Sequence, residues 1–94
     1  MREDDEQVLD TVIVCATSEE HTEHAYTVSR KMRNKFPVLF IGVVPEKKLT
    51  DIYKRYEKEG VRSVVSVDGT TLYARNLSLR ETKSGTYDTV IKHI

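Results

Sequence analysis

The chain has 94 residues, 38% of them hydrophobic and 32% charged, and its fifteen basic and fifteen acidic side chains cancel. This length suits one domain, and a single cysteine excludes an internal disulfide. No apolar stretch approaches the roughly 20 residues of a membrane-spanning helix, and the acidic first ten residues do not resemble a signal peptide. We therefore expect an intracellular protein in a reducing compartment, nuclear or cytoplasmic.

The neutral total hides an uneven distribution of charge. Residues 1–29 carry eight acidic side chains and one basic side chain, whereas residues 30–94 carry fourteen basic and seven acidic ones. Such asymmetry indicates a basic binding surface in the second part of the chain. The alternative is that surface helices simply carry solvated charges, as lysine-rich helical faces often do.

Residues 1–10 are predicted to form an acidic, disordered leader, and residues 11–94 a single domain. The domain opens with an apolar run at residues 11–16, which predicts a strand buried on both faces. Cys15 lies inside this run, so we interpret it as a buried structural side chain rather than a reactive thiol.

A helical pattern follows the first strand and extends to Phe36. Thr17 and Glu20 fit a capping box at its start, in which each side chain satisfies a backbone amide of the other residue. Pro37 ends the helix, because the residue before a proline avoids helical geometry, and residues 38–44 return as a second strand.

The second helix begins after Pro45, a residue that suits a helix entry, and its apolar side chains from Leu49 to Tyr56 share one face. Gly60 fits a left-handed helix terminator. Residues 61–67 then predict a third strand, slightly more polar than the first two and therefore nearer an edge of the sheet.

The last third of the chain predicts a hairpin and a closing helix. Asp68 and Gly69 form a strong hairpin signal, after which residues 72–79 should run back antiparallel to the third strand. A loop through residues 83–85 leads to a helical pattern at residues 86–94.

This alternation of strands and helices is typical of an α/β domain with right-handed crossovers. We expect a three-layer mixed sheet in the order βαβαββα. The sheet should be mainly parallel with one antiparallel hairpin strand, and helices should cover both of its faces.

Several catalytic chemistries do not fit the sequence. The turn at residues 16–20 has no glycine and two carboxylates, which disfavours a phosphate-binding loop, and Asp10 lies at the wrong end of the first strand for a phosphoacceptor site. Cys15 lacks the arginine of a phosphatase loop at position 21, which is His21. His21 and His24 have the wrong spacing for a zinc-protease helix. We expect no enzyme, no metal site and no cofactor.

A basic, partly aromatic surface is the remaining functional signal. Tyr73 and Arg75 alternate on one side of the predicted fourth strand, and Asn76 is next to them. Guanidinium groups, aromatic rings and amides are the groups that bind single-stranded RNA. An equally good interpretation is that Tyr73 packs under a helix. The other basic residues of this surface are Arg30, Lys31, Arg33, Lys35, Lys47, Lys48, Lys54, Arg55, Lys58, Arg62 and Arg80.

The chain resembles the anticodon-binding domain at the C-terminus of class II aminoacyl-tRNA synthetases for histidine, proline, threonine and glycine. The likeness covers nearly the whole chain after residue 10. It is carried by residues 11–16, 24–26 and 30–33, 47–53, 60–69, 71–79 and 86–94. Versions of this domain outside synthetases, as in a nuclear receptor coactivator, resemble binding modules without catalytic activity.

The sequence also departs from this family. The glycine usual before the second helix is replaced by Glu46-Lys47-Lys48, and the proline common before the third strand is absent from residues 61–63. The chain has no Leu-x-x-Leu-Leu motif through which a coactivator would contact a nuclear receptor. It has no synthetase catalytic domain.

The resemblance implies a non-catalytic RNA-binding module of a larger protein or complex, with tRNA-like or single-stranded RNA as partner. Tyr73, Arg75 and Asn76 are the candidates for base or ribose contact, and Lys47, Lys48 and Arg62 the candidates for phosphate contact. The alternative is a protein–protein interaction domain of a transcriptional coactivator or RNA-processing factor that has lost RNA binding. Neither hypothesis involves a membrane or a nucleotide cofactor.

Overall fold

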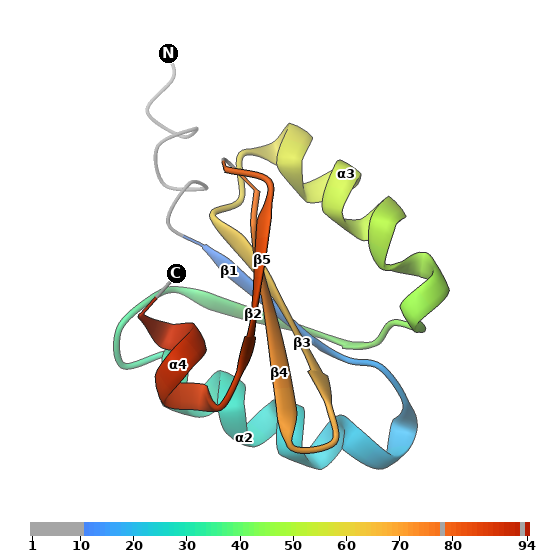
Figure 1. Ribbon diagram of the computed structural model, residues 1–94, viewed down its shortest axis with the longest axis vertical. Coiled ribbons are helices and arrows are strands. Elements are labelled where there is room, and N and C mark those ends of the chain that lie inside the picture. The colour runs from blue at the N-terminus through green and yellow to red at the C-terminus, as the bar shows by residue number, and fades with distance from the viewer. Residues whose placement is uncertain (1–10, 78, 93) are drawn as a thin grey trace.

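The computed structural model describes residues 11–77, 79–92 and 94, which form one five-stranded sheet with helices on both faces (Figure 1). The strands lie in the order β2-β1-β3-β4-β5. β1 pairs in parallel with β2 and β3, whereas β4 pairs antiparallel with β3 and β5. The elements are β1 (Val12–Ala16), η1 (Glu19–His21), α2 (Thr22–Met32), β2 (Val38–Val43), η2 (Glu46–Lys48), α3 (Leu49–Glu59), β3 (Ser63–Asp68), β4 (Thr71–Asn76), β5 (Glu81–Gly85) and α4 (Tyr87–Ile91).

The expected three-layer mixed α/β fold is confirmed, but two details of the prediction are wrong. The sheet is not mainly parallel, since two of the described strand pairings are parallel and two are antiparallel. Strand β3, expected nearer an edge, lies in the middle of the sheet. Helices α2 and α4 cover one face of the sheet and α3 covers the other (Figure 1). The predicted leader at residues 1–10 lies outside the described residues. No helix in the described ranges is long and apolar enough to cross a membrane.

Strand β1 lies between β2 and β3, and all five of its residues are buried. Because side chains alternate across a strand, Val12 and Val14 pack into the core beneath α2, while Ile13 and Cys15 pack into the core beneath α3. The continuous apolar run predicted this two-sided burial correctly.

The sheet contains one strand more than expected. Residues 83–85, predicted as a loop, belong to β5, which pairs with β4 from Leu72 opposite Gly85 to Asn76 opposite Glu81. Strand β5 is an edge strand made largely of exposed polar residues, so no alternation of apolar and polar side chains marks it in the sequence. The fourth strand is correspondingly shorter than predicted and ends at Asn76, because the chain turns there toward β5.

The helices also differ in detail from the prediction. Helix α2 ends at Met32 rather than continuing to Phe36. Thr17 and Glu20 form no capping box: η1 intervenes, and the Thr17 hydroxyl instead donates to the backbone carbonyl of Val67 at the end of β3. Gly60 does end α3 in the left-handed conformation, with a φ of 80°.

Candidate nucleic-acid interface

A groove of about 420 Å³ opens between α3 and β4, on the α3 side of the sheet. Strand alternation places Tyr73, Arg75 and Leu77 on this side, and Leu72 and Ala74 on the side of α2 and α4. Helix α3 supplies the opposite wall. The groove is lined by Thr50, Tyr53, Lys54, Glu57, Arg75, Leu77 and Arg80.

Arg75 is held in this groove by two neighbours. Its guanidinium carbon lies 5.4 Å from the centroid of the Tyr53 ring, and its Nη1 donates to the Thr82 hydroxyl over 3.2 Å. Its Nε is buried and has no hydrogen-bond partner among the residues that the structure describes. Burial raises the pKa of the Tyr53 phenol, and the positive charge of Arg75 opposes that rise. Tyr53 therefore stays neutral, and its ring presents a π face to the cation.

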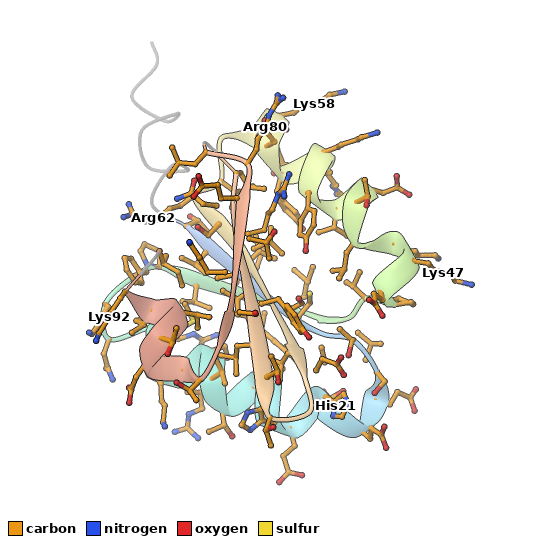
Figure 2. The ribbon with its side chains drawn as sticks, in the orientation of Figure 1. His21, Lys47, Lys58, Arg62, Arg80 and Lys92 are labelled. Atoms are coloured by element: carbon orange, nitrogen blue, oxygen red, sulfur yellow. The ribbon has the colours of Figure 1, made fainter. Side chains whose placement is uncertain are left out.

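The groove carries an excess of positive charge. Arg80, in the turn that precedes β5, donates from Nε to Glu57 Oε2 of α3 over 3.0 Å. Lys54 and Arg75 also line the groove, so its lining contains three cationic side chains and one carboxylate. Figure 2 shows Arg80 beside the end of α3 that carries Lys58. An anionic ligand is thus favoured over a cationic one at this site.

A second cavity of about 190 Å³ adjoins the groove and shares Tyr53 with it. Its aromatic walls are Tyr53 and Tyr73, and its polar groups include two carboxylates. The lining residues are Thr17, Glu46, Leu49, Tyr53, Ser66, Asp68 and Tyr73. The α3 side of the sheet therefore offers a basic groove and a smaller, carboxylate-bearing cavity that shares Tyr53 with it.

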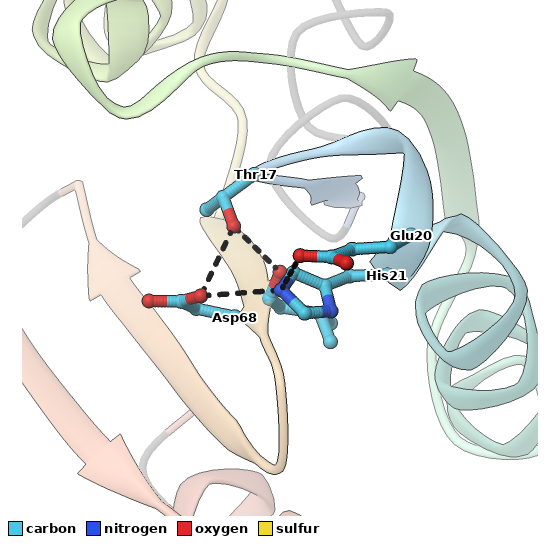
Figure 3. Close-up of polar contacts among 5 residues, drawn as sticks. Thr17, Glu20, His21 and Asp68 are labelled. Carbon is cyan, nitrogen blue, oxygen red and sulfur yellow. Dashed lines mark hydrogen bonds and ion pairs between the residues drawn. The ribbon is translucent and has the colours of Figure 1, made fainter.

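Polar contacts fix the edge of this second cavity (Figure 3). Thr17 Oγ1 lies 3.4 Å from Asp68 Oδ1, and His21 Nε2 lies 3.4 Å from the same oxygen and 3.8 Å from Glu20 Oε1. These contacts tie the segment after β1 to the turn between β3 and β4. No cluster of three or more metal-ligating side chains occurs in the described residues.

The structure brings Tyr73 and Arg75 to one side of the sheet, as strand alternation required. Lys47 and Lys48 lie exposed on η2, beside the second-cavity residues Glu46 and Leu49. In Figure 2, Lys47 projects outward from that end of α3. Their contacts with RNA stay predictions.

Arg62 and Asn76 do not line the groove. Arg62 Nη2 donates to the backbone carbonyl of Ile94 over 2.8 Å, and its guanidinium lies 5.3 Å from the Phe36 ring centroid. Asn76 alternates onto the opposite side of β4 from Arg75, and its Oδ1 accepts the amide of Leu79 over 3.0 Å. Figure 2 shows Arg62 on the other side of the molecule from Lys47.

The sequence did not indicate Tyr53 as a site residue, because its spacing matches the apolar face of a helix. It does pack against the core beneath α3, yet it also lines both cavities. The pairing of Tyr53 with Arg75 depends on how α3 lies over β4, and no local pattern reports that. The sequence does show that a lysine, Lys54, directly follows Tyr53, and this pairing of a ring with a cation could have drawn attention to it.

No protein-family model and no curated protein matches the chain. Solved structures do. The RNA binding domain of threonyl-tRNA synthetase from Cryptosporidium parvum Iowa II matches 90% of this chain at 17% identity, with a TM-score of 0.70, over 22% of its own length. Histidyl-tRNA synthetase from Nostoc sp. PCC 7120 matches 87% of this chain at 16% identity, with a TM-score of 0.72, over 21% of its own length.

Apo histidyl-tRNA synthetase from S. aureus matches 94% of this chain at 14% identity, with a TM-score of 0.59, over 27% of its own length. The chain thus spans about a fifth to a quarter of the synthetase chains that it matches. At these identities the likeness shows the fold. The fold that the resemblance to synthetase anticodon-binding domains implied is confirmed.

Proposed function

We propose that this chain, which has the fold of an RNA-binding domain from a synthetase, is a non-catalytic RNA-binding module of a larger protein. It takes single-stranded or tRNA-like RNA in the groove between α3 and β4. The observation that carries the proposal is Arg75, which lies over the Tyr53 ring in a groove with two further cations and one carboxylate.

The groove offers both kinds of contact that single-stranded RNA needs. Arg75, Arg80 and Lys54 supply donors and positive charge for phosphates, and the binding should therefore weaken with salt. The half-buried rings of Tyr53 and Tyr73 supply surfaces on which unstacked bases can lie. Recognition of this kind requires no nucleophile and no cofactor.

The contact set that we propose differs from the six residues that the sequence indicated. It omits two of them and adds Tyr53, Lys54 and Arg80, which line the groove. Lys47 and Lys48 are retained as phosphate contacts, because they lie between Glu46 and Leu49 of the second cavity, which shares Tyr53 with the groove. Arg62 and Asn76 are left out, because the Arg62 side chain reaches the backbone carbonyl of Ile94 and Asn76 alternates onto the opposite side of β4 from Arg75.

A protein-interaction domain of a coactivator or RNA-processing factor is the second candidate. The observation in its favour is the carboxylates beside the cations: Glu57 pairs with Arg80, and Glu46 and Asp68 line the second cavity. These groups repel phosphate and suit a mixed-charge protein surface.

The experiment is an NMR titration of the labelled chain with a tRNA anticodon stem-loop and with a scrambled single strand, each at two salt concentrations. We expect shifts at Tyr53, Tyr73 and Arg75, together with an affinity that falls as salt rises. The variant Arg75→Gln should weaken binding about tenfold, because it removes a charge-assisted hydrogen bond to phosphate. The control Arg55→Gln removes an arginine of α3 that does not line the groove, and should change little.

Two outcomes would reject the proposal. One is the absence of shifts at low salt, where electrostatic binding is strongest, which would favour the protein-interaction domain. The other is equal weakening by Arg75→Gln and Arg55→Gln, which would mean that RNA senses the overall charge rather than the groove.

A further inference from the structure

Strand β2 forms one edge of the sheet and is almost entirely apolar. It runs through Val38–Val43 without a charged residue, and Leu39 and Val43 are 50% and 40% exposed. The opposite edge is different, since β5 carries Glu81 and Lys83 with exposed side chains. Charged edges resist pairing with other strands, whereas an uncharged apolar edge is a ready template for it.

A stripe of residues on α2 lies beside this edge. The Tyr26 ring contacts Phe40 of β2 edge to face, with the ring centroids 5.8 Å apart, and Tyr26 is 46% exposed. The Arg30 guanidinium lies 6.0 Å from the Tyr26 ring centroid. Glu23 lies three residues before Tyr26, and Arg33, the C-cap of α2, lies three residues after Arg30 with helical backbone angles, so all four share one helical face.

The charges of this stripe are divided along the helix. Its N-terminal end carries Glu23, its middle carries Tyr26, and its C-terminal end carries Arg30 and Arg33. Within the described part of the chain, none of these three charged side chains forms an ion pair. A stripe that is acidic at one end and basic at the other is complementary to a second copy of itself turned end to end.

We propose that a second copy of this chain covers the β2 edge. The two β2 strands pair antiparallel across a twofold axis near Leu39 and Phe40, and the two sheets join into one of ten strands. The same axis places the two α2 helices antiparallel to each other, so that Glu23 of each copy faces the Arg30 and Arg33 end of the other.

The spacings of regular structure permit this arrangement. Paired strands lie about 4.8 Å apart, so helices seated over β1 and β2 of each copy come to about 10–14 Å from one another. That is close to the 8–10 Å at which helices pack, and long glutamate and arginine side chains span the difference. Gly42, with a φ of 91°, and the irregular register at that end of β2 confine the pairing to the first part of the strand.

The groove between α3 and β4 stays open in this dimer, because it lies toward the other edge of the sheet. The inference therefore does not depend on RNA binding, and either proposal can fail alone.

The test is sedimentation velocity of the 94-residue chain over a range of concentrations, with circular dichroism as the check of folding. We expect a concentration-dependent dimer. Leu39→Lys, which changes an exposed side chain at the edge, should weaken it about a hundredfold by placing two like charges at the axis. Lys83→Glu, at the opposite edge, should leave the dimer constant unchanged.

A charge exchange tests the antiparallel geometry. Glu23→Lys alone, and Arg30→Glu with Arg33→Glu alone, should each weaken self-association about tenfold, because like charges then face each other. An equimolar mixture of these two variants should regain dimers, since the acidic variant now faces the basic one. A monomeric wild type at low salt, a dimer that tolerates Leu39→Lys, or a mixture that fails to associate would each overturn the proposal.

Discussion

The two faces of the sheet are built from the same strands and yet differ in how completely they are covered. Helices α2 and α4 together cover one face, where Met32, Val90 and Val14 have no exposed surface. Helix α3 alone covers the other face, and both the basic groove and the carboxylate-bearing cavity open there. The face beneath α2 and α4, here called the closed face, supplies most of the packing without water. The face beneath α3, the open face, leaves aromatic and charged side chains accessible to a ligand.

This difference has a direct physical basis. A single helix covers a sheet face only in part, so the strand residues beyond α3 remain at a surface. On β4 those positions are Tyr73 and Arg75, which present rings and charge instead of aliphatic side chains. Stability and binding should therefore be separable by mutation of the two faces.

The strongest test removes packing from the closed face. Met32→Ala should lower the free energy of unfolding by about 2–5 kcal/mol, because it leaves a cavity where a fully buried side chain was. Denaturant unfolding measures this loss, and Met32→Leu, which nearly conserves volume, is the control with a cost below about 1.5 kcal/mol. RNA affinity per folded molecule should not change. A loss of affinity in a folded Met32→Ala protein would contradict the separation of the faces.

The second test measures how the free energy of unfolding depends on pH through Cys15, which lies in the core beneath α3. Burial raises the pKa of the Cys15 thiol from 9.0 to about 11. Between these two values the unfolded chain releases this proton while the folded chain keeps it, so stability is full below pH 9 and falls as pH rises toward 11. The fall should reach about 2–3 kcal/mol.

Other groups titrate in the same range, so the measurement is a difference. Unfolding free energies of the wild type and of Cys15→Ala are followed from about pH 8 to about pH 11, and only the wild type should show the extra fall. Parallel curves for the two proteins would mean that the Cys15 thiol ionises as readily in the folded chain as in the unfolded one.

The third test removes a ring from the open face. Tyr53→Leu keeps an apolar side chain against the core but loses the surface for stacking, which is worth about 1–3 kcal/mol per base. RNA affinity should fall about tenfold or more by fluorescence anisotropy. The matched control is Tyr56→Leu, a tyrosine of the same helix that packs against the same core without lining either cavity. Equal losses from the two variants would assign the effect to packing of α3.

The smallest effect concerns the lysines at the start of α3. Lys47→Ala with Lys48→Ala should lower RNA affinity modestly and reduce the slope of log affinity against log salt by about 1.4, or about 0.7 for each phosphate that is no longer neutralised. Stability should change by less than about 0.5 kcal/mol, since both side chains are exposed. An unchanged salt slope would remove these lysines from the binding surface.

The sequence predicted those features that depend on local pattern. The apolar run of β1, the hairpin at Asp68 and Gly69, and the left-handed Gly60 each have a local cause, and the structure confirms each. Strand alternation likewise placed Tyr73 and Arg75 on one side. Strand β5 was missed, because it is recognisable only by its pairing with β4.

The candidate site was predicted less completely than the fold. Asn76 and Arg62 carry chemistry typical of RNA-binding residues, but in the fold Asn76 Oδ1 accepts from the Leu79 amide, Arg62 Nη2 donates to the Ile94 carbonyl, and neither residue lines the groove. Tyr53 was assigned to the core, and no sequence pattern measures how far α3 leaves its ring uncovered. Tertiary contacts, absent from local patterns, decide all three positions.

The two sides of β3 imply an order of events during folding. Its antiparallel partner β4 is joined to it by the two-residue turn between Asp68 and Thr71, so that this pairing closes a very short loop. Its parallel partner β1 lies about fifty residues away, as the bond from Thr17 to the Val67 carbonyl shows, and that closure costs far more chain entropy. The β3–β4 hairpin should therefore form early, and the docking of β1 onto β3 should set the folding rate.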